Sequence, residues 1–223
     1  MEASGSVRDV QPSDTARRGA ETTASSNAVS VVRAVVLVGF MGSGKSSIAR
    51  RLAWRLKCRA LDLDKRLAAQ CGASIAHIFA ERGEAEFRAL ESAALHDTLH
   101  HATRDGAVIS TGGGIVKSAE NREALRCAAQ QGALVVYLRA RPETLARRIR
   151  RQPGTRPLID GEAILDMEQT QARVEDLLSE RAALYEECAG AVVDTDDLSL
   201  HEVVETIERR LRKMDGEFIQ SAP

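Results

Sequence analysis

Short, continuous apolar runs alternate along the chain with stretches in which apolar residues recur every three or four positions. A continuous apolar run next to glycine is typical of a strand buried on both faces of a parallel sheet, and the wider spacing is typical of an amphipathic helix. Strands are predicted at 31–39, in a short segment that ends at 61–64, and at 106–110, 132–138 and 189–195. Helices are predicted at about 45–57, in stretches up to about 101, at 118–130, from Pro142 onward, at 163–188 and at 200–213.

This alternation predicts an α/β fold with one domain, residues 31–215, in which a central parallel five-stranded sheet carries helices on both faces. Residues 1–30 are rich in Ser, Thr, Ala and charge and show no apolar periodicity, so we expect a disordered N-terminal tail. Residues 216–223 are expected to form a short C-terminal tail. Two prolines and two glycines fall within 151–161, which predicts a loop there.

Composition narrows the class of protein. The chain has 31 Lys and Arg against 32 Asp and Glu, a formal net charge of −1, which argues against a general nucleic-acid binder. Its four cysteines are far apart in sequence and show no zinc or redox spacing, so reduced thiols in a cytoplasmic protein are expected. No apolar run approaches the length of a membrane span, so we expect no membrane partner.

The first predicted strand leads directly into GFMGSGKSS, in which Gly39, Gly44, Lys45 and Ser46 match the phosphate-loop pattern G-x-x-x-x-G-K-[ST]. In that motif backbone N–H groups surround the phosphates, the lysine reaches the β- and γ-phosphates, and the hydroxyl binds Mg²⁺. The strand-to-helix context is the one that the motif requires, so we expect a nucleoside triphosphate here. The expected nucleotide contacts are Gly42, Ser43, Gly44, Lys45, Ser46 and Ser47.

A kinase that acts on a small molecule fits better than other nucleotide-binding proteins. About 190 ordered residues leave little room for the coupling domains of a large ATPase. The chain also lacks the Asn-Lys-x-Asp segment with which small GTPases read guanine. A kinase needs an acceptor pocket, and strand alternation would place Asp62 and Asp64 on one face at the carboxyl end of the second strand, where ligands bind. The alternative is a solvated strand end with Asp64 capping the next helix.

Six segments together resemble the shikimate kinases in order and spacing: GFMGSGKSS, LDLD, SIAHIFAERGEAEFR, STGGG, RPLI and ERAALYEE. The resemblance covers about residues 33–212. It implies a three-layer P-loop kinase fold with a mobile lid, and transfer of the γ-phosphoryl group of ATP to the 3-hydroxyl of shikimate. It also implies Lys45, Asp64 and Arg156 as catalytic residues, with Asp64 as the candidate base, and Ser46 and Asp62 as the groups that organise Mg²⁺.

The same resemblance implies that Gly112, Gly113 and Gly114 form a wall of the shikimate site. Glycine there lets the backbone approach the substrate, and Gly113 is the expected contact. From the residues alone, a loop before the next helix is the alternative, although such a loop would not need three adjacent glycines.

Two arginines are implied as the clamp on the shikimate carboxylate, because a guanidinium group binds a carboxylate through two parallel hydrogen bonds. They are Arg88 and Arg181, and Phe79 and Phe87 match positions that line the site. The residues alone leave other interpretations open: surface ion pairs of Arg88 with Glu84 or Glu91, a similar pairing of Arg181, and core packing of both phenylalanines.

Five arginines lie between Arg147 and Arg156. Arg156 matches the lid arginine that closes over ATP and neutralises charge on the transferring phosphoryl group. One of Arg147 or Arg148 is expected to stack on adenine. A nucleic-acid patch is the alternative, weakened by the neutral net charge and the missing aromatic platform. We expect a monomer whose partners are shikimate and ATP; the rival functions are a gluconate kinase and a nucleotide-binding regulator that has lost catalysis.

Overall fold

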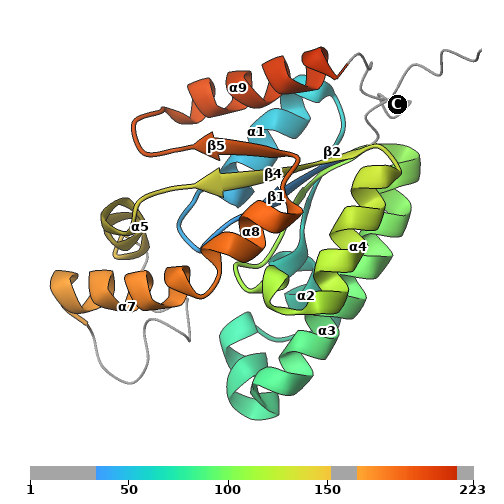
Figure 1. Ribbon diagram of the computed structural model, residues 1–223. Helices are drawn as coiled ribbons and strands as arrows, with labels where there is room; N and C mark the ends of the chain where they lie inside the picture. The colour runs from blue at the N-terminus through green and yellow to red at the C-terminus, as the bar shows by residue number, and fades with distance from the viewer. Residues whose placement is uncertain (1–33, 152–164, 215–223) are drawn as a thin grey trace, which may run out of the picture.

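The apolar runs form one parallel sheet in the computed structural model, which describes residues 34–151 and 165–214 (Figure 1). Its strands lie in the order β2-β3-β1-β4-β5, and every pairing between neighbours is parallel. The strands are β1 (Ala34–Val38), β2 (Arg59–Asp62), β3 (Ala107–Ser110), β4 (Ala133–Arg139) and β5 (Ala191–Asp194). The predicted α/β fold with a central parallel five-stranded sheet is confirmed.

Helices cover both faces of this sheet. They are α1 (Lys45–Leu56), α2 (Leu63–Cys71), α3 (Ile75–Asp105), the short 3₁₀ helix η1 (Ile115–Lys117), α4 (Ala119–Gln130), α5 (Pro142–Ile149), α7 (Met167–Ser179), α8 (Ala182–Cys188) and α9 (Leu200–Lys213). Figure 1 shows α1 and α9 together on one side of the strands, with α4 and α8 on the other. Three layers result, as the resemblance implies.

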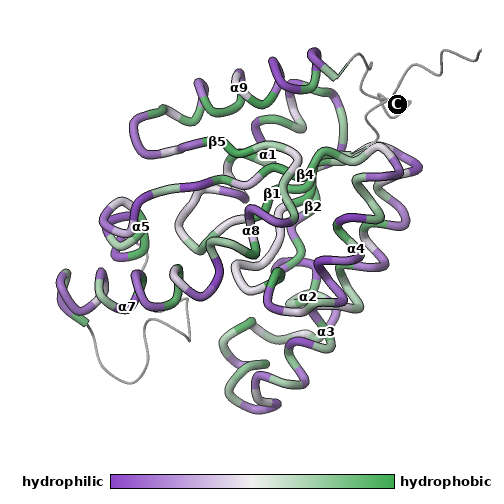
Figure 2. Tube along the Cα trace, in the orientation of Figure 1, coloured by the Kyte–Doolittle hydropathy of each residue, from purple (hydrophilic) through white to green (hydrophobic). Residues whose placement is uncertain are grey.

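Alternation along β1 shows why both faces need a cover. Val36 lies in one buried cluster with residues of α3, α4, α5, α7 and α8, whereas Val35 and Leu37 lie in a second cluster with residues of α1 and α9. Every residue of β1 is fully buried. In Figure 2 the strands are mainly hydrophobic, and α4 and α9 alternate between polar and apolar residues as amphipathic helices do. The continuous apolar run correctly predicted a strand that is buried on both faces.

Two element boundaries predicted from the hydrophobic pattern were wrong. The predicted strand through Asp64 ends at Asp62, whose carboxylate accepts a hydrogen bond from the Lys65 amide and caps α2. The predicted helix at 163–188 is two helices, α7 and α8, which separate at Glu180 and Arg181. The helical spacing of apolar residues continues across this break, because both helices direct apolar residues toward the same core.

A further break lies inside α3, where Gly83 has a left-handed φ of 76° and divides the helix into two segments. Several predictions fall outside the described residues: the N-terminal tail, the first residues of the domain, Arg156 with most of its loop, and the C-terminal tail.

Candidate functional site

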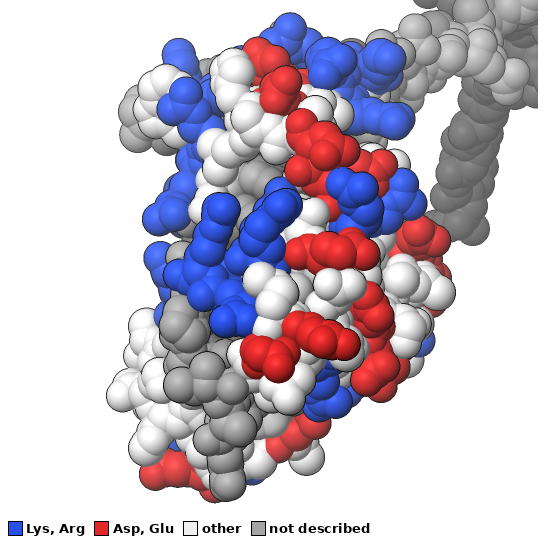
Figure 3. All heavy atoms as spheres, turned by 90° about the vertical axis from the view of Figure 1, so that its left-hand side faces the viewer, with Lys and Arg blue, Asp and Glu red and all other residues white. Residues whose placement is uncertain are grey.

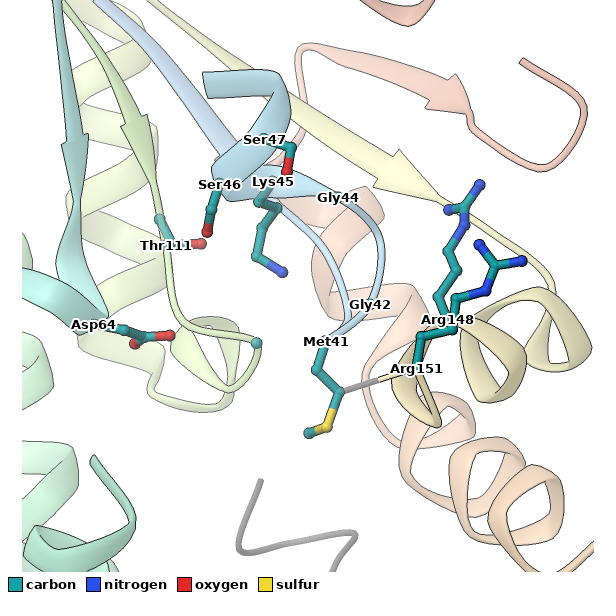
Figure 4. A pocket seen from close by; sticks show the side chains of 11 residues that line it. Met41, Gly42, Gly44, Lys45, Ser46, Ser47, Asp64, Thr111, Arg148 and Arg151 are labelled. Atoms are coloured by element: carbon teal, nitrogen blue, oxygen red, sulfur yellow. The ribbon is translucent and has the colours of Figure 1, made fainter. Parts of the chain in front are cut away.

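The phosphate loop joins β1 to α1 at the carboxyl edge of the sheet, where it borders a pocket of about 370 Å³ (Figure 4). The Lys45 side chain is buried, and its ammonium group donates to the carbonyls of Gly39 and Phe40, both at 2.8 Å. In Figure 4 the amine of Lys45 points into the pocket. The residues that line the pocket are Met41, Gly42, Gly44, Lys45, Ser46, Ser47, Asp64, Thr111, Gly113, Arg148 and Arg151.

The first turn of α1 is suited to an anion. Gly44, its N-terminal cap residue, has a left-handed φ of 94° and no side chain, and no hydrogen bond from a side chain caps the helix. Several other helices of the described part are capped by the side chain of their N-cap residue, such as α7 by Asp166 and α9 by Ser199, whereas α5 and α8 lack such a cap as α1 does. The N-terminal amides of α1 and its positive dipole end therefore face the pocket without a competing carboxylate.

The hydroxyl of Ser46 lies 3.3 Å from that of Ser110, the last residue of β3. Ser110 is in turn paired in register with Asp62 on β2. The sheet thus brings a hydroxyl from the phosphate loop close to the end of a strand that carries a carboxylate. Within the described residues no group of three or more His, Cys, Asp or Glu side chains could hold a metal by itself. Mg²⁺ does not need one, because it usually keeps waters and substrate phosphates among its ligands.

Asp62 and Asp64 do not share one strand face, so that prediction was wrong. Asp62 caps α2, which is the role that the alternative interpretation gave to Asp64, and Asp64 lies in the first turn of the helix and reaches the pocket. Burial raises the pKa of Asp64, the charge of Lys45 opposes this shift, and the charge of Asp62 adds to it. The helix start therefore separates a capping carboxylate from a pocket carboxylate.

The glycine triplet is needed for space rather than for backbone conformation, because none of its residues has a left-handed φ. A Cβ on Gly112 would lie 2.2 Å from Glu91 Oε1, and one on Gly114 would lie 2.4 Å from Arg88 Nη1. A Cβ on Gly113 would face the other way, 3.1 Å from the amide nitrogen of Met41 in the phosphate loop. The triplet is thus a thin partition between the phosphate loop and the charged groups of α3.

Arg88 on α3 makes the ion pairs that the alternative interpretation proposed. Its Nη1 lies 2.6 Å from Glu91 Oε2, and its Nη2 lies 3.3 Å from Glu84 Oε1. Glu91 is only 2% exposed, so this pair is an internal one. Burial raises the pKa of Glu91, and the charge of Arg88 opposes that shift. Since the guanidinium also contacts the triplet at Gly114, the ion pairs position Arg88 at the site and do not remove it from the site.

Arg181 is the N-terminal cap residue of α8 and is 1% exposed. Its guanidinium lies over the ring of Phe40 in the phosphate loop, 5.6 Å from the ring centre. Two of its nitrogens, Nε and Nη1, are buried without a hydrogen-bond partner among the described residues. A buried guanidinium with unpaired N–H groups costs free energy unless an anion completes its hydrogen bonds. The surface ion pair considered for Arg181 is therefore wrong.

Phe79 and Phe87 contact each other, with ring centres 5.1 Å apart. Phe87 is buried with Leu67 and Ile78 in a small cluster between α2 and α3, against which Phe79 packs. The Phe87 ring also lies 5.1 Å from the Arg88 guanidinium carbon. Both rings therefore pack in this cluster, as the alternative interpretation proposed. The same cluster supports Arg88 through the Phe87 ring.

Arg148 and Arg151, but not Arg147, line the pocket on the side of α5. Arg148 donates to the hydroxyl of Thr195 at 2.9 Å and also to its carbonyl, so it is anchored just beyond β5. In Figure 3, which turns the left-hand side of Figure 1 toward the viewer, Lys and Arg side chains gather on this face beside acidic ones. Two arginines of the basic stretch noted in the sequence, Arg148 and Arg151, therefore border the pocket at the phosphate loop.

Two residues near the site were missed by sequence reasoning as functional candidates. Glu91 appeared only as a surface partner of Arg88, and Tyr185 was not singled out. The available signal for Glu91 was its spacing of three residues from Arg88 on a helix, which places the two side chains side by side. Tyr185 gave no signal beyond its place in the ERAALYEE segment, because its partners lie far away in sequence.

Comparison with known proteins agrees with this geometry. A family model described as shikimate kinase matches residues 41–212. A shikimate kinase of Enterococcus faecalis is 38% identical over 183 residues, which cover 82% of this chain and all of the relative. One of Bordetella pertussis is 39% identical over 178 residues, which cover 80% of this chain and 78% of the relative.

Among solved structures, the shikimate kinase from Acinetobacter baumannii in complex with shikimate superposes with a TM-score of 0.73 at 32% identity. The match covers 83% of this chain and 96% of that one. No helix within the described ranges is long and apolar enough to cross a membrane.

The family model and these relatives cover most of the chain and agree on one family: the chain belongs to the shikimate kinases.

Proposed function

We propose that this chain transfers the γ-phosphoryl group of ATP to the 3-hydroxyl of shikimate, with the acceptor held between the glycine triplet, α3 and α8. Lys45 and the amides of the phosphate loop hold the phosphates. Asp64 orients the acceptor hydroxyl and accepts its proton, while the departing ADP keeps the bridging oxygen. Placement of the two reactants and charge stabilisation supply most of the rate.

The observation that carries this proposal is the buried Arg181, whose Nε and Nη1 find no hydrogen-bond partner in the part of the chain that the structure describes and therefore need an anion. A carboxylate is the anion that a planar guanidinium binds best, through two parallel hydrogen bonds. Glu91 is the nearby carboxylate, but it is engaged by Arg88 at 2.6 Å. An acceptor that brings its own carboxylate fits this site, and a neutral sugar alcohol would leave the arginine unpaired.

Mg²⁺ fits the donor set next to the loop. Ser46, whose side chain is exposed to the pocket, and Asp62 would hold the ion together with phosphate oxygens and water. When bound, the ion neutralises charge on the β- and γ-phosphates. The protein's part is to hold the Ser46 hydroxyl, which it does through the contact with Ser110.

Three further parts of the proposal rest on the sequence. Arg156, beyond the described residues, closes over the nucleotide as a lid arginine. Residues 1–30 and 216–223 are tails on a domain at 31–215. The protein acts in the cytoplasm as a monomer, on small molecules and not on nucleic acid.

A coupled assay of ADP release tests the proposal. With ATP and Mg²⁺, shikimate should stimulate ADP release strongly, whereas gluconate and a no-acceptor control should not. A nucleotide-binding regulator would release no ADP with any acceptor, and a gluconate kinase would prefer gluconate. Either result would refute the proposed acceptor.

Arg181→Ala and Arg88→Ala then test the clamp. Charge-assisted hydrogen bonds contribute about 1.5–3 kcal/mol each, so the affinity for shikimate should fall roughly tenfold or more in either variant. The affinity for ATP should change little. Replacement by Lys should rescue poorly, because an ammonium group lacks the planar fork. Equal titration of shikimate into wild type and both Ala variants would show that the clamp is assigned wrongly.

A further inference from the structure

Tyr185 links the two halves of the acceptor site. It lies on α8, four residues after Arg181, and its side chain is fully buried. Its ring stacks on Tyr137 of β4, with ring centres 5.0 Å apart and planes inclined by 22°. This stack restrains the direction of the ring and of the hydroxyl that it carries.

The Tyr185 hydroxyl donates a hydrogen bond to the carbonyl oxygen of Gly113, the middle residue of the triplet. The charge of the Arg181 guanidinium also acts on this phenol, opposing the effect of burial on its pKa. Burial raises the pKa of Tyr185 well above its ordinary value, so the hydroxyl keeps its proton and remains a donor throughout the working pH range. One phenol thus bonds to the glycine wall and lies on the helix that begins at the arginine that we assign to the carboxylate.

The three carbonyls of the triplet are held in different ways. Those of Gly112 and Gly114 accept from the amides of Ile115 and Lys117, within the turn itself. That of Gly113 accepts from a side chain that lies 72 residues further along the chain. Glycine peptides have little steric restraint of their own, so this peptide depends on an external partner for its orientation.

We propose that Tyr185 is a positioning residue for shikimate, which locks the Gly113–Gly114 peptide against α8, the helix that begins at Arg181. This inference rests on the proposed acceptor site. It adds that the wall and the clamp are one unit, because α8 carries both the arginine and the phenol that fixes the wall. Loss of the hydroxyl therefore weakens acceptor binding and leaves the nucleotide side intact.

The test compares two variants that each remove one buried hydroxyl from the same stacked pair. Tyr185→Phe keeps the ring and loses the bond to Gly113. Tyr137→Phe is the matched control: Tyr137 is 2% exposed and stacks in the same pair, but the hydrogen bond to Gly113 comes from Tyr185. KM for shikimate, KM for ATP, kcat and the melting temperature are measured for both variants and the wild type.

Tyr185→Phe should raise KM for shikimate roughly five- to tenfold, with KM for ATP unchanged within about twofold. Tyr137→Phe should leave both KM values unchanged, whatever its effect on the melting temperature. A Tyr185→Phe protein that melts earlier but has the wild-type KM for shikimate would overturn the proposal, because the hydroxyl would then be only a structural group.

Amide hydrogen exchange without substrates gives a second readout that does not depend on activity. The Gly114 N–H belongs to the same peptide as the Gly113 carbonyl, so its exchange should speed up in Tyr185→Phe and not in Tyr137→Phe. Unchanged exchange at Gly114 would also overturn the proposal. Failure of the proposed function is distinguishable, since the wild-type protein would then show no ADP release that depends on shikimate.

Discussion

Replacing Gly112 by alanine adds one methyl group at the most crowded position of the glycine triplet, in the proposed acceptor site. The backbone of Gly112 is not left-handed, so alanine can adopt its conformation without strain. The obstacle is contact: the new Cβ would lie 2.2 Å from Glu91 Oε1 and 3.1 Å from Asp64 Oδ1. Both carboxylates face the same small space, and the variant therefore acts on the charged groups around the acceptor.

The size of the effect follows from how firmly Glu91 is held. Its carboxylate must move by more than about 1 Å to reach an ordinary contact distance. It is buried, and its other oxygen is 2.6 Å from Arg88, so the movement either breaks that ion pair or shifts the arginine. Overpacking costs about 1–3 kcal/mol of stability. Displacing one charge-assisted contact to shikimate costs about 1.5–3 kcal/mol, which corresponds to a roughly 10- to 150-fold fall in kcat/KM.

The assay measures kcat/KM for shikimate at saturating ATP, KM for ATP at saturating shikimate, and the melting temperature. Gly190→Ala is the matched control, because a Cβ there would meet its nearest atom at an ordinary 3.5 Å. Gly113→Ala is the contrasting variant. Its Cβ would press on the Met41 amide of the phosphate loop at 3.1 Å, so both the ATP and the shikimate kinetics should change.

A folded Gly112→Ala protein with the wild-type kcat/KM for shikimate would refute this reasoning. It would mean that the side chains of Glu91 and Arg88 can move aside without weakening the binding or the reaction of shikimate. Impairment of KM for ATP to the same extent as for shikimate would contradict the separation of the two sides of the triplet. Either result would leave the clamp arginines as the main argument for the acceptor site.

Three other outcomes are expected. Asp64→Asn should keep the fold and lower kcat by about 10²–10⁴-fold, and near-normal turnover in a folded protein would exclude Asp64 as the base. Burial raises the pKa of Cys58 and of Cys188 to about 11, so each is only about 0.1% thiolate at pH 8 and should react slowly with a thiol reagent; counting fast thiols in the native protein checks this, and more than two would contradict it. Composition predicts that deleting residues 1–29 changes neither melting temperature nor turnover, and a lower melting temperature would show that the tail docks.

Local pattern was enough to predict the sheet and the phosphate loop. A strand buried on both faces must be apolar throughout, and β1 is. The phosphate loop is contiguous, so the motif from Gly39 to Ser46 carries its own geometry, and the left-handed φ of Gly44 is a property of that short segment. These features depend on neighbours within a few residues of one another, which is the range over which sequence reasoning works.

The acceptor side depended on tertiary structure. β2 ends at Asp62 because this residue caps α2. The alternation of apolar and polar residues does not show whether the strand continues to Asp64 or the helix begins before it. By its sequence, Arg181 could form a surface ion pair. Only the packing of α8 against the phosphate loop buries it over Phe40, with Nε and Nη1 lacking a hydrogen-bond partner among the described residues. The crowding at Gly112 comes from Glu91 on a different helix, and the bond from Tyr185 to Gly113 joins residues 72 positions apart. Such contacts are set by how the layers stack, because burial and unmet hydrogen bonds are properties of the assembled core and are not encoded in any local spacing of residues.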